Sequence, residues 1–172
     1  MRINKTIILI FLLGQGLCVF SQEKIETLSI DWPGNQDWRT IQDKDDSLQH
    51  VQIVIPGNES AATATIIGVV KVMKGMLSQN TSDLIEYYQK SLGDGTAMTI
   101  IDKKDRKHRW ILFKVETPAS KKYPIAESDL YYVLQGDYGI YETHIAIKTA
   151  KMEAEFQKKW VKIFMAAKLN LN

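Results

Sequence analysis

The chain has 172 residues, of which 22 are Lys or Arg and 20 are Asp or Glu, so its formal net charge is +2 at pH 7. Two basic residues, Arg2 and Lys5, precede residue 22 without any acidic residue, and the rest of the chain is formally neutral. This neutrality excludes a global electrostatic case for nucleic-acid binding. The only cysteine, Cys18, also precedes residue 22, so a cleaved chain would have no cysteine nucleophile, thiolate metal site or disulfide.

The first 21 residues have the layout of a secretory signal peptide. Arg2 and Lys5 give a short positive start, Ile7–Leu13 is an unbroken apolar run, and Val19–Ser21 precedes a plausible cleavage site before Gln22. We therefore predict a signal peptide over 1–21 and a mature chain over 22–172. A mature length of about 150 residues fits one domain with one hydrophobic core.

Two alternatives stay open for this leader. An uncleaved membrane anchor would use Ile7–Phe20, but these 14 residues are fewer than the roughly 20 that cross a bilayer. Lipid attachment at Cys18 normally follows a small residue, and Leu17 stands there. We expect cleavage, with no stable membrane insertion afterwards.

Residues 22–47 form a polar lead-in segment, which we interpret as a short strand or irregular stretch followed by a turn. Its last part carries three aspartates, at 43, 45 and 46. Such a cluster can belong to a calcium loop, which also needs Gly at its sixth position and Glu at its twelfth. Counted from Asp43, these positions hold Leu48 and Val54. The motif fails, and the aspartates are predicted to lie in a solvated loop.

Two strands are predicted next. In Leu48–Ile55, one alternate set of side chains is almost wholly apolar, as in a strand with one buried face. Pro56 and the following glycine end it. Ala64–Met73 is β-branched and nearly continuous, which is typical of a central strand that is buried on both faces.

A helix is predicted over Ser82–Leu92. Thr81 or Ser82 would be its N-cap, and Asp83 would lie in the first turn, where the helix dipole favours a negative charge. Apolar residues follow at helical spacing, and Gly93 provides a stop.

The following segments predict antiparallel strands. Their bounds are Ala97–Asp102, Arg109–Glu116, Asp129–Gln135 and Gly139–Lys148, the last two joined by a tight hairpin turn. In the last strand, residues 140, 142, 144 and 146 share a face that includes Glu142 and His144. We expect that face to be the wetter one, because strand side chains alternate between faces.

A long C-terminal helix is predicted over Thr149–Lys168, because apolar residues repeat there at steps of three and four. Its bulky aromatic stripe is typical of a helix docked on a sheet of the same domain. The order of elements predicts a single α+β domain over 48–172, with a central antiparallel sheet flanked by helices.

No motif in the chain carries recognisable chemistry. His50, His108 and His144 have no second histidine at metal-ligand spacing. No G-x-S-x-G elbow or phosphate-binding loop occurs. Glu116 and Glu142 could form a carboxylate pair if they face each other on adjacent strands. We predict no catalytic residue, metal or cofactor, and no enzymatic activity; a small metal-assisted hydrolase that uses the three histidines is an alternative.

The link between two predicted strands is strongly basic. It can be interpreted as a solvated hairpin tip or as a contact surface for an acidic partner. The loop Thr117–Glu127 is a second candidate for such contacts. The partner that we expect for either surface is another protein. The residues of this basic tip are Lys103, Lys104, Arg106, Lys107, His108 and Arg109.

The second half of the chain resembles a known group of small exported domains. The segments that carry the resemblance are VKVMKG (70–75), DLIEYYQKSL (83–92), RWILFKVE (109–116), LYYVLQGDYGIYETHIAIK (130–148) and FQKKWVKIFMAAKL (156–169). They are similar in layout to the Mog1/PsbP-like α/β/α sandwich group. The resemblance implies a central antiparallel sheet between helices and a binding or accessory role, with no functional residue to transfer.

The leader, which ends Val-Phe-Ser before Gln22, resembles those of Bacteroidetes-type Gram-negative bacteria. This implies a periplasmic or secreted protein. We therefore expect an exported, non-enzymatic binding or accessory protein. An immunity protein that neutralises a secreted toxin in the periplasm is an alternative, because some immunity proteins resemble small exported domains of this kind.

Overall fold

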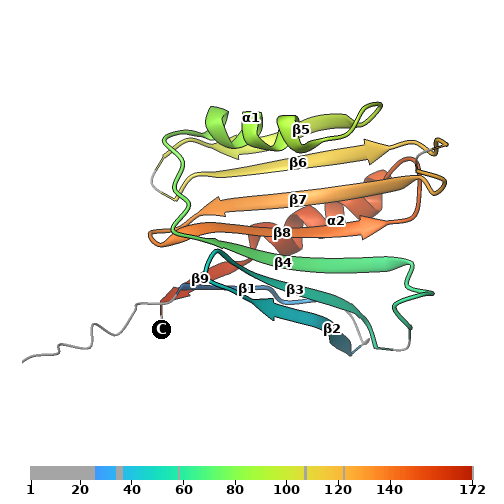
Figure 1. Ribbon diagram of the computed structural model, residues 1–172, viewed down its shortest axis with the longest axis horizontal. Coiled ribbons are helices and arrows are strands. Elements are labelled where there is room, and N and C mark those ends of the chain that lie inside the picture. Colours follow the sequence, from blue (N-terminus) through green and yellow to red (C-terminus); the bar gives the residue numbers. More distant parts are fainter. Residues whose placement is uncertain (1–25, 34–36, 58, 107, 122, 172) are drawn as a thin grey trace, which may run out of the picture.

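A computed structural model describes residues 26–33, 37–57, 59–106, 108–121 and 123–171 (Figure 1). The predicted signal peptide, with Cys18, lies outside the described residues. So do the start of the predicted lead-in and Lys107 of the basic tip.

A seven-stranded antiparallel sheet forms the centre of the molecule (Figure 1). Its spatial order is β2-β3-β4-β8-β7-β6-β5. A second, two-stranded sheet pairs β1 with β9. The strands are β1 (Glu26–Ser29), β2 (Trp38–Asp45), β3 (Gln49–Pro56), β4 (Ile66–Lys74), β5 (Ala97–Lys104), β6 (Trp110–Thr117), β7 (Glu127–Gln135), β8 (Gly139–Ile147) and β9 (Lys168–Leu171).

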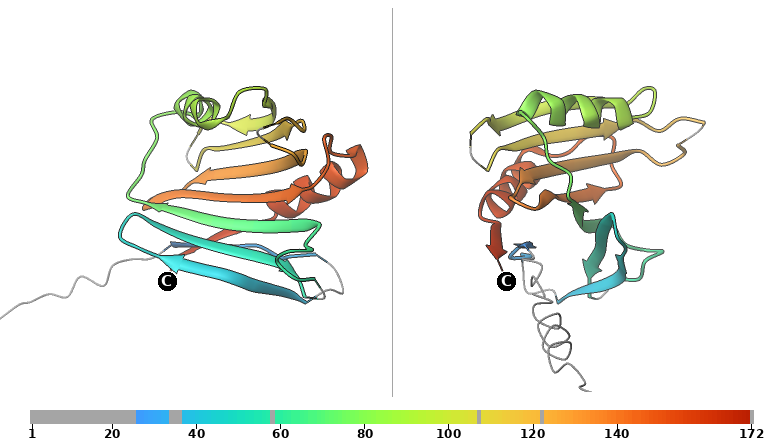
Figure 2. Two further views of the ribbon diagram at one scale, coloured as in Figure 1. Left: turned by 45° about the vertical axis from the view of Figure 1, so that its right-hand side comes forward. Right: turned by 60° about the vertical axis from the view of Figure 1, so that its left-hand side comes forward.

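Two helices pack on opposite faces of the large sheet (Figure 1, Figure 2). Helix α1 (Thr81–Ser91) contacts β5 and β6, and helix α2 (Ala154–Met165) contacts β7. We call these the α1 face and the α2 face. Among the described residues, neither helix has the length and apolarity that a membrane crossing requires.

Each face carries its own hydrophobic core. The buried core of the α1 face consists of Met73, Leu84, Tyr88, Ile111, Phe113, Val115, Val133 and Ile140. The α2 face is built around Trp160, which is 2% exposed. Its ring lies 6.0 Å from that of Trp32 and 5.9 Å from that of Trp38. Trp32 precedes β2 and Trp38 is the first residue of β2. Both lie in the predicted lead-in segment, which therefore belongs to the core of the α2 face.

The predicted fold class, an α+β sandwich with a sheet flanked by helices, is wrong. Strands make up 48% of the described chain and helices 16%, so the protein is a β-rich fold. The sequence interpretation counted six strands, whereas the structure adds β1, β2 and β9. Each helix also covers only part of its face, because α1 contacts β5 and β6 and α2 contacts β7. The sheet is therefore not enclosed between two helical layers.

Most of the individual elements were predicted correctly. Strands β3 to β8 are found close to their expected bounds, and β7 and β8 form the expected hairpin. Helix α1 starts one residue earlier than expected, because Asn80 is the N-cap and its side chain accepts from the Asp83 backbone N–H. Helix α2 is shorter than the predicted 149–168, and the chain returns as β9 to pair with β1.

Candidate functional site

A cluster of polar side chains lies on the α1 face where β7 and β8 meet. Asp129 and Tyr131 come from β7, and Glu142 and His144 from β8. Tyr131 pairs directly with His144 across the two strands. Because side chains alternate along a strand, all four project to the face that α1 covers in part.

Glu142 is buried and fully engaged. Its side chain is 7% exposed; one carboxylate oxygen accepts from the Tyr88 hydroxyl at 2.5 Å, and the other lies 3.1 Å from Nδ1 of His144. Burial raises the pKa of Glu142, but the bonds to His144 and Tyr88 together lower it by more than burial raises it. The net shift of the pKa is therefore downward. Burial and the Glu142 charge together raise the pKa of Tyr88. Glu142 is therefore an ionised anchor between α1 and β8.

Asp129 has the opposite character, because it is buried without a partner. The residue is 5% exposed, and it forms no hydrogen bond or ion pair with any part of the chain that the structure describes. Among the described residues, Arg109 Nε is the one fully occluded side-chain polar atom without a hydrogen bond. The Asp129 oxygens also lack a hydrogen bond, so they are not fully occluded and still reach solvent. Burial raises the pKa of Asp129 to about 7, against a smaller opposing effect of His144.

Aromatic rings form a row beside Asp129. Tyr131 stacks on Phe113 of β6, with ring centroids 4.8 Å apart and planes 2° apart. On the other side it lies 4.4 Å from the ring of His144. Burial, followed by the nearby Asp129 charge, raises the pKa of the Tyr131 hydroxyl. The row holds both rings in place, which leaves the Tyr131 hydroxyl as a fixed neutral group at the site.

The α1 face continues beyond this cluster toward β4 and β3. Val69 pairs with His144, and Lys71 pairs with Glu142. Val69, Ile67 and Ile53 on this part of the face are half-buried, and the main helix contacts of this face are those of α1 with β5 and β6. The polar cluster thus lies at the margin of α1, next to an apolar and partly open sheet surface.

A groove of about 480 Å³ lies on the α2 face, between β1 and the ends of β3, β4 and β8. Its floor includes Val70 and Val72. Polar groups of its lining already have partners: Lys74 Nζ lies 2.5 Å from Asp45 within the lining, and His50 Nε2 lies 2.6 Å from Asp43 beside it.

Glu26, in the same groove, accepts from the backbone N–H groups of Asp137 and Tyr138 in the β7–β8 turn. Its carboxylate therefore fixes that turn to β1. The groove presents a mainly apolar surface, with no unsatisfied charge among its described lining residues.

A second cavity, of about 640 Å³, lies between β6 and the start of α2. Lys114, in its lining, forms an ion pair with Glu116 at 2.9 Å. Glu116 also accepts from the Met152 backbone N–H at 3.3 Å. These contacts connect β6 to the segment before α2, and they give both charged groups a structural partner.

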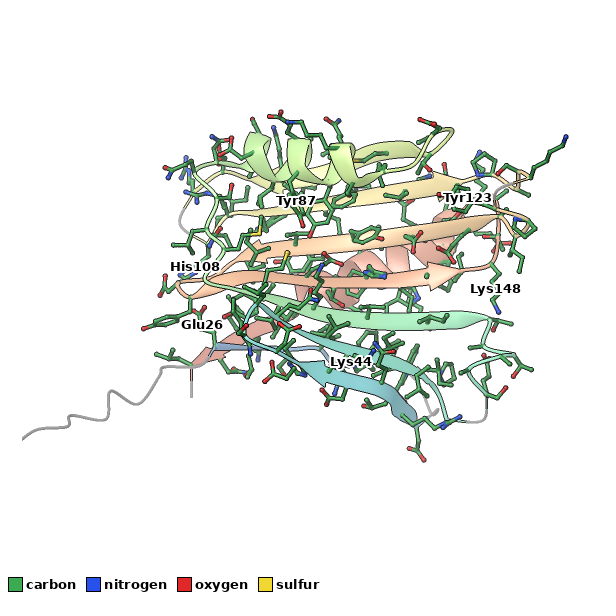
Figure 3. The ribbon with its side chains drawn as sticks, viewed as in Figure 1. Glu26, Lys44, Tyr87, His108, Tyr123 and Lys148 are labelled. Atoms are coloured by element: carbon green, nitrogen blue, oxygen red, sulfur yellow. The ribbon has the colours of Figure 1, made fainter. Side chains whose placement is uncertain are left out.

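The three histidines considered for a metal site do not converge. His50 projects to the α2 face, His144 to the α1 face, and His108 lies in the β5–β6 turn at one end of the sheet (Figure 3). Among the described residues, no three His, Cys, Asp or Glu side chains are grouped so that they could hold a metal ion.

The considered pairing of Glu116 with Glu142 is also wrong. Glu116 lies on β6 and Glu142 on β8, with β7 between them. The two carboxylates project to opposite faces of the sheet. They share no site.

Hydrogen bonds hold part of the basic tip in place. Asp105 accepts from the Thr81 backbone N–H at 3.0 Å, and Arg109 donates to the Ser78 carbonyl. These bonds attach the β5–β6 turn to the start of α1. The side chains of Lys103, Lys104, Arg106 and His108 are exposed. Their role as a partner-contact surface stays a prediction, and they lie at the opposite end of β6 from Val115, the strand partner of Asp129.

The cluster around Asp129 was not predicted from the sequence. The face with Glu142 and His144 was expected to be the wetter one, but Ile140, Glu142 and Ala146 are all buried. Helix α1 packs on this side, which the alternation pattern of one strand cannot reveal. The available signal was the acidic residue at the start of an otherwise apolar strand, Asp129 before Leu130.

No family model and no curated protein matches this chain. The resemblance to the Mog1/PsbP-like group therefore stays a prediction. The sandwich architecture that it implied for this chain is wrong, as the β-rich fold shows. Function has to be argued from the site itself.

Proposed function

We propose that the protein is an exported, non-enzymatic binding protein that holds a small ligand on its α1 face, at the cluster of Asp129, Tyr131 and His144. The observation that supports this proposal is the buried carboxylate of Asp129, which has no described partner and still reaches solvent. A buried polar group without a partner is costly, and such groups occur where a ligand completes the bonding.

The surroundings of Asp129 suit binding better than catalysis. Ligand sites are mostly apolar with a few well-placed polar groups, and the half-buried side chains of Ile67 and Val69 supply the apolar part. Glu142 already bonds to Tyr88 and His144, so it positions its neighbours and has no free oxygen to act as a general base. The proposal of export rests on the leader pattern of residues 1–21.

A matched pair of variants tests which face binds. Val69 and Val70 are consecutive, half-buried residues of β4 that project to the α1 face and to the α2 groove, respectively. Val69→Lys should abolish binding of small molecules from a chemically diverse library, because its side chain would fill the surface beside His144. Val70→Lys should leave binding intact.

The measurement is a two-dimensional amide NMR titration of the mature chain. We expect ligand-dependent shifts at amides of β7, β8 and β4. Shifts confined to β1 and to the groove, with loss in Val70→Lys instead of Val69→Lys, would contradict the proposed site. Export is tested separately, by fractionating a Gram-negative host and measuring whether the periplasmic chain begins at Gln22. The immunity-protein alternative stays a prediction.

A further inference from the structure

We infer that the ligand carries a primary ammonium group, and that this group pairs with the Asp129 carboxylate at the edge of α1. This inference rests on the proposed function, because it names the chemical class that the same site would accept. Four observations support it: the unpartnered carboxylate, the further hydrogen-bonding groups around it, the charge of the surroundings and the lack of a metal-ligand cluster among the described residues.

The first observation concerns the carboxylate. Asp129 is 5% exposed and lacks a hydrogen-bond or ionic partner among the described residues. Buried charges in proteins are generally paired, because the charged form loses its hydration. A cation that binds here would replace the lost hydration with a direct, charge-assisted hydrogen bond. An anionic ligand would place two negative charges in the same poorly hydrated space.

The second observation is the presence of further hydrogen-bonding groups next to Asp129. Tyr131 is two residues along the same strand, a separation of about 7 Å. His144 is the strand partner of Tyr131, and therefore a diagonal neighbour of Asp129 at about 7–8 Å. Nδ1 of His144 is held by Glu142, whereas its Nε2 has no described partner. An ammonium group offers three donors, so it can pair with the carboxylate and still donate to a further acceptor beside it.

The third observation is the charge of the surroundings. The titratable groups that face Asp129 are Glu127 and Tyr131 on β7, His144 and Glu142 on β8, and Tyr88 on α1. The carboxylates outnumber the cationic groups. Lys71, on β4, pairs across the strands with Glu142, and its charge acts on that carboxylate. The described neighbours of Asp129 therefore leave a negative excess.

The fourth observation separates an organic cation from a metal ion. No group of three metal-ligating side chains exists among the described residues, so a divalent ion would find one unpaired carboxylate. An alkylammonium needs only that carboxylate for its charge. Its alkyl part would lie along the half-buried apolar surface of Ile67 and Val69.

Butylammonium and butan-1-ol are the probes that test this inference. They share the alkyl chain and differ in the charged group. At pH 8, butylammonium should shift amides of β7 and β8 and should bind at least about tenfold more tightly than butan-1-ol, since charge-assisted bonds exceed neutral ones. Asp129→Asn should weaken butylammonium at least about tenfold and leave butan-1-ol unchanged.

Glu127→Gln is the matched control, because it removes the same charge from an exposed position on the same face of β7. It should change the affinity for butylammonium less than about threefold, because exposed charges contribute little. Lowering the pH from 8 to 6 should also weaken butylammonium in the wild-type chain and have a smaller effect in Asp129→Asn. The reason is that protonation of Asp129 removes its charge.

Each outcome bears on the inference. Equal binding of the two probes, or full affinity of Asp129→Asn for butylammonium, would overturn the ammonium assignment and leave the α1 face as a binding surface. Absence of shifts with butylammonium would also overturn it. If library compounds shift the α1 face and butylammonium does not, the proposed function stands and the inference fails. If both fail to shift that face, both are wrong.

Discussion

In the wild-type chain, the Asp129 carboxyl should make the free energy of unfolding fall as the pH rises toward neutral. Asp129→Asn should remove this pH dependence. Burial raises the pKa of Asp129 from 3.8 to about 7. Below 3.8 the carboxyl is protonated in both the folded and the unfolded chain, so it contributes no pH dependence. Between 3.8 and 7 the unfolded chain loses this proton and the folded chain keeps it, so the free energy of unfolding falls as the pH rises.

The size of this effect follows from the same two values. One pKa unit corresponds to about 1.4 kcal/mol, so the full change is about 4 kcal/mol between pH 4 and pH 8. The variant has no carboxyl to ionise at this position. The difference in unfolding free energy, variant minus wild type, should therefore increase by about 4 kcal/mol over that range.

Urea denaturation at a series of pH values, followed by tryptophan fluorescence, measures this difference. All other titrating groups are common to both chains, so their contributions largely cancel in the difference. Glu127→Gln, on the same strand and exposed, is the control and should give a difference that is nearly flat with pH. A flat difference for Asp129→Asn as well would show that the carboxylate is hydrated or paired in solution, and would refute the reasoning.

Three further changes test the packing around the two faces, each by urea denaturation. Trp160→Ala should cost about 3–5 kcal/mol, because the ring is 2% exposed between two other tryptophans; a cost below about 1 kcal/mol would contradict a packed α2 core. Gly68→Ala should cost about 1–3 kcal/mol, because a Cβ there would lie 2.5 Å from the Trp32 ring; a neutral effect would show that Trp32 does not pack on β4. Tyr88→Phe should cost about 1.5–3 kcal/mol at pH 7, because its hydroxyl donates to the ionised Glu142. This cost should shrink as the pH falls and Glu142 becomes protonated, and a constant cost would mean that the bond does not depend on the charge.

The sequence predicted the strands that are apolar on at least one face, and it missed those that are not. Strand β2, at the edge of the sheet, is exposed at most positions, so its sequence lacks a clear alternating pattern. Strand β9 is four residues long and follows α2 within three residues. The apolar spacing of the helix continues into it, and no Gly or Pro marks the end of α2. These missed strands led to the wrong fold class.

The candidate site was harder to predict than the strands, because it depends on which face each helix covers. The alternation in β8 showed that Glu142 and His144 share a face, and the structure agrees. The packing of α1 on that face brings Tyr88 to Glu142, across 54 residues of sequence. The burial of Asp129 depends on the same long-range packing. A single-strand pattern carries no information about either contact.

The pairing of β4 with β8 has a consequence for the order in which the chain folds. Strands β2, β3 and β4 follow one another as antiparallel neighbours in the sheet, and so do β5 to β8. The two groups meet in one ladder, in which Ile66–Lys74 pairs with Gly139–Ile147 through nine residue pairs. This ladder closes the long loop between Lys74 and Gly139. Closing such a loop is slow compared with forming hairpins.

Until β8 emerges and docks, β4 is an unpaired edge with the apolar sequence IIGVVKVM, which can pair with other chains. The nascent protein is therefore most exposed to aggregation before β8 (Gly139–Ile147) is complete, and the step that protects it is the closure of this central ladder.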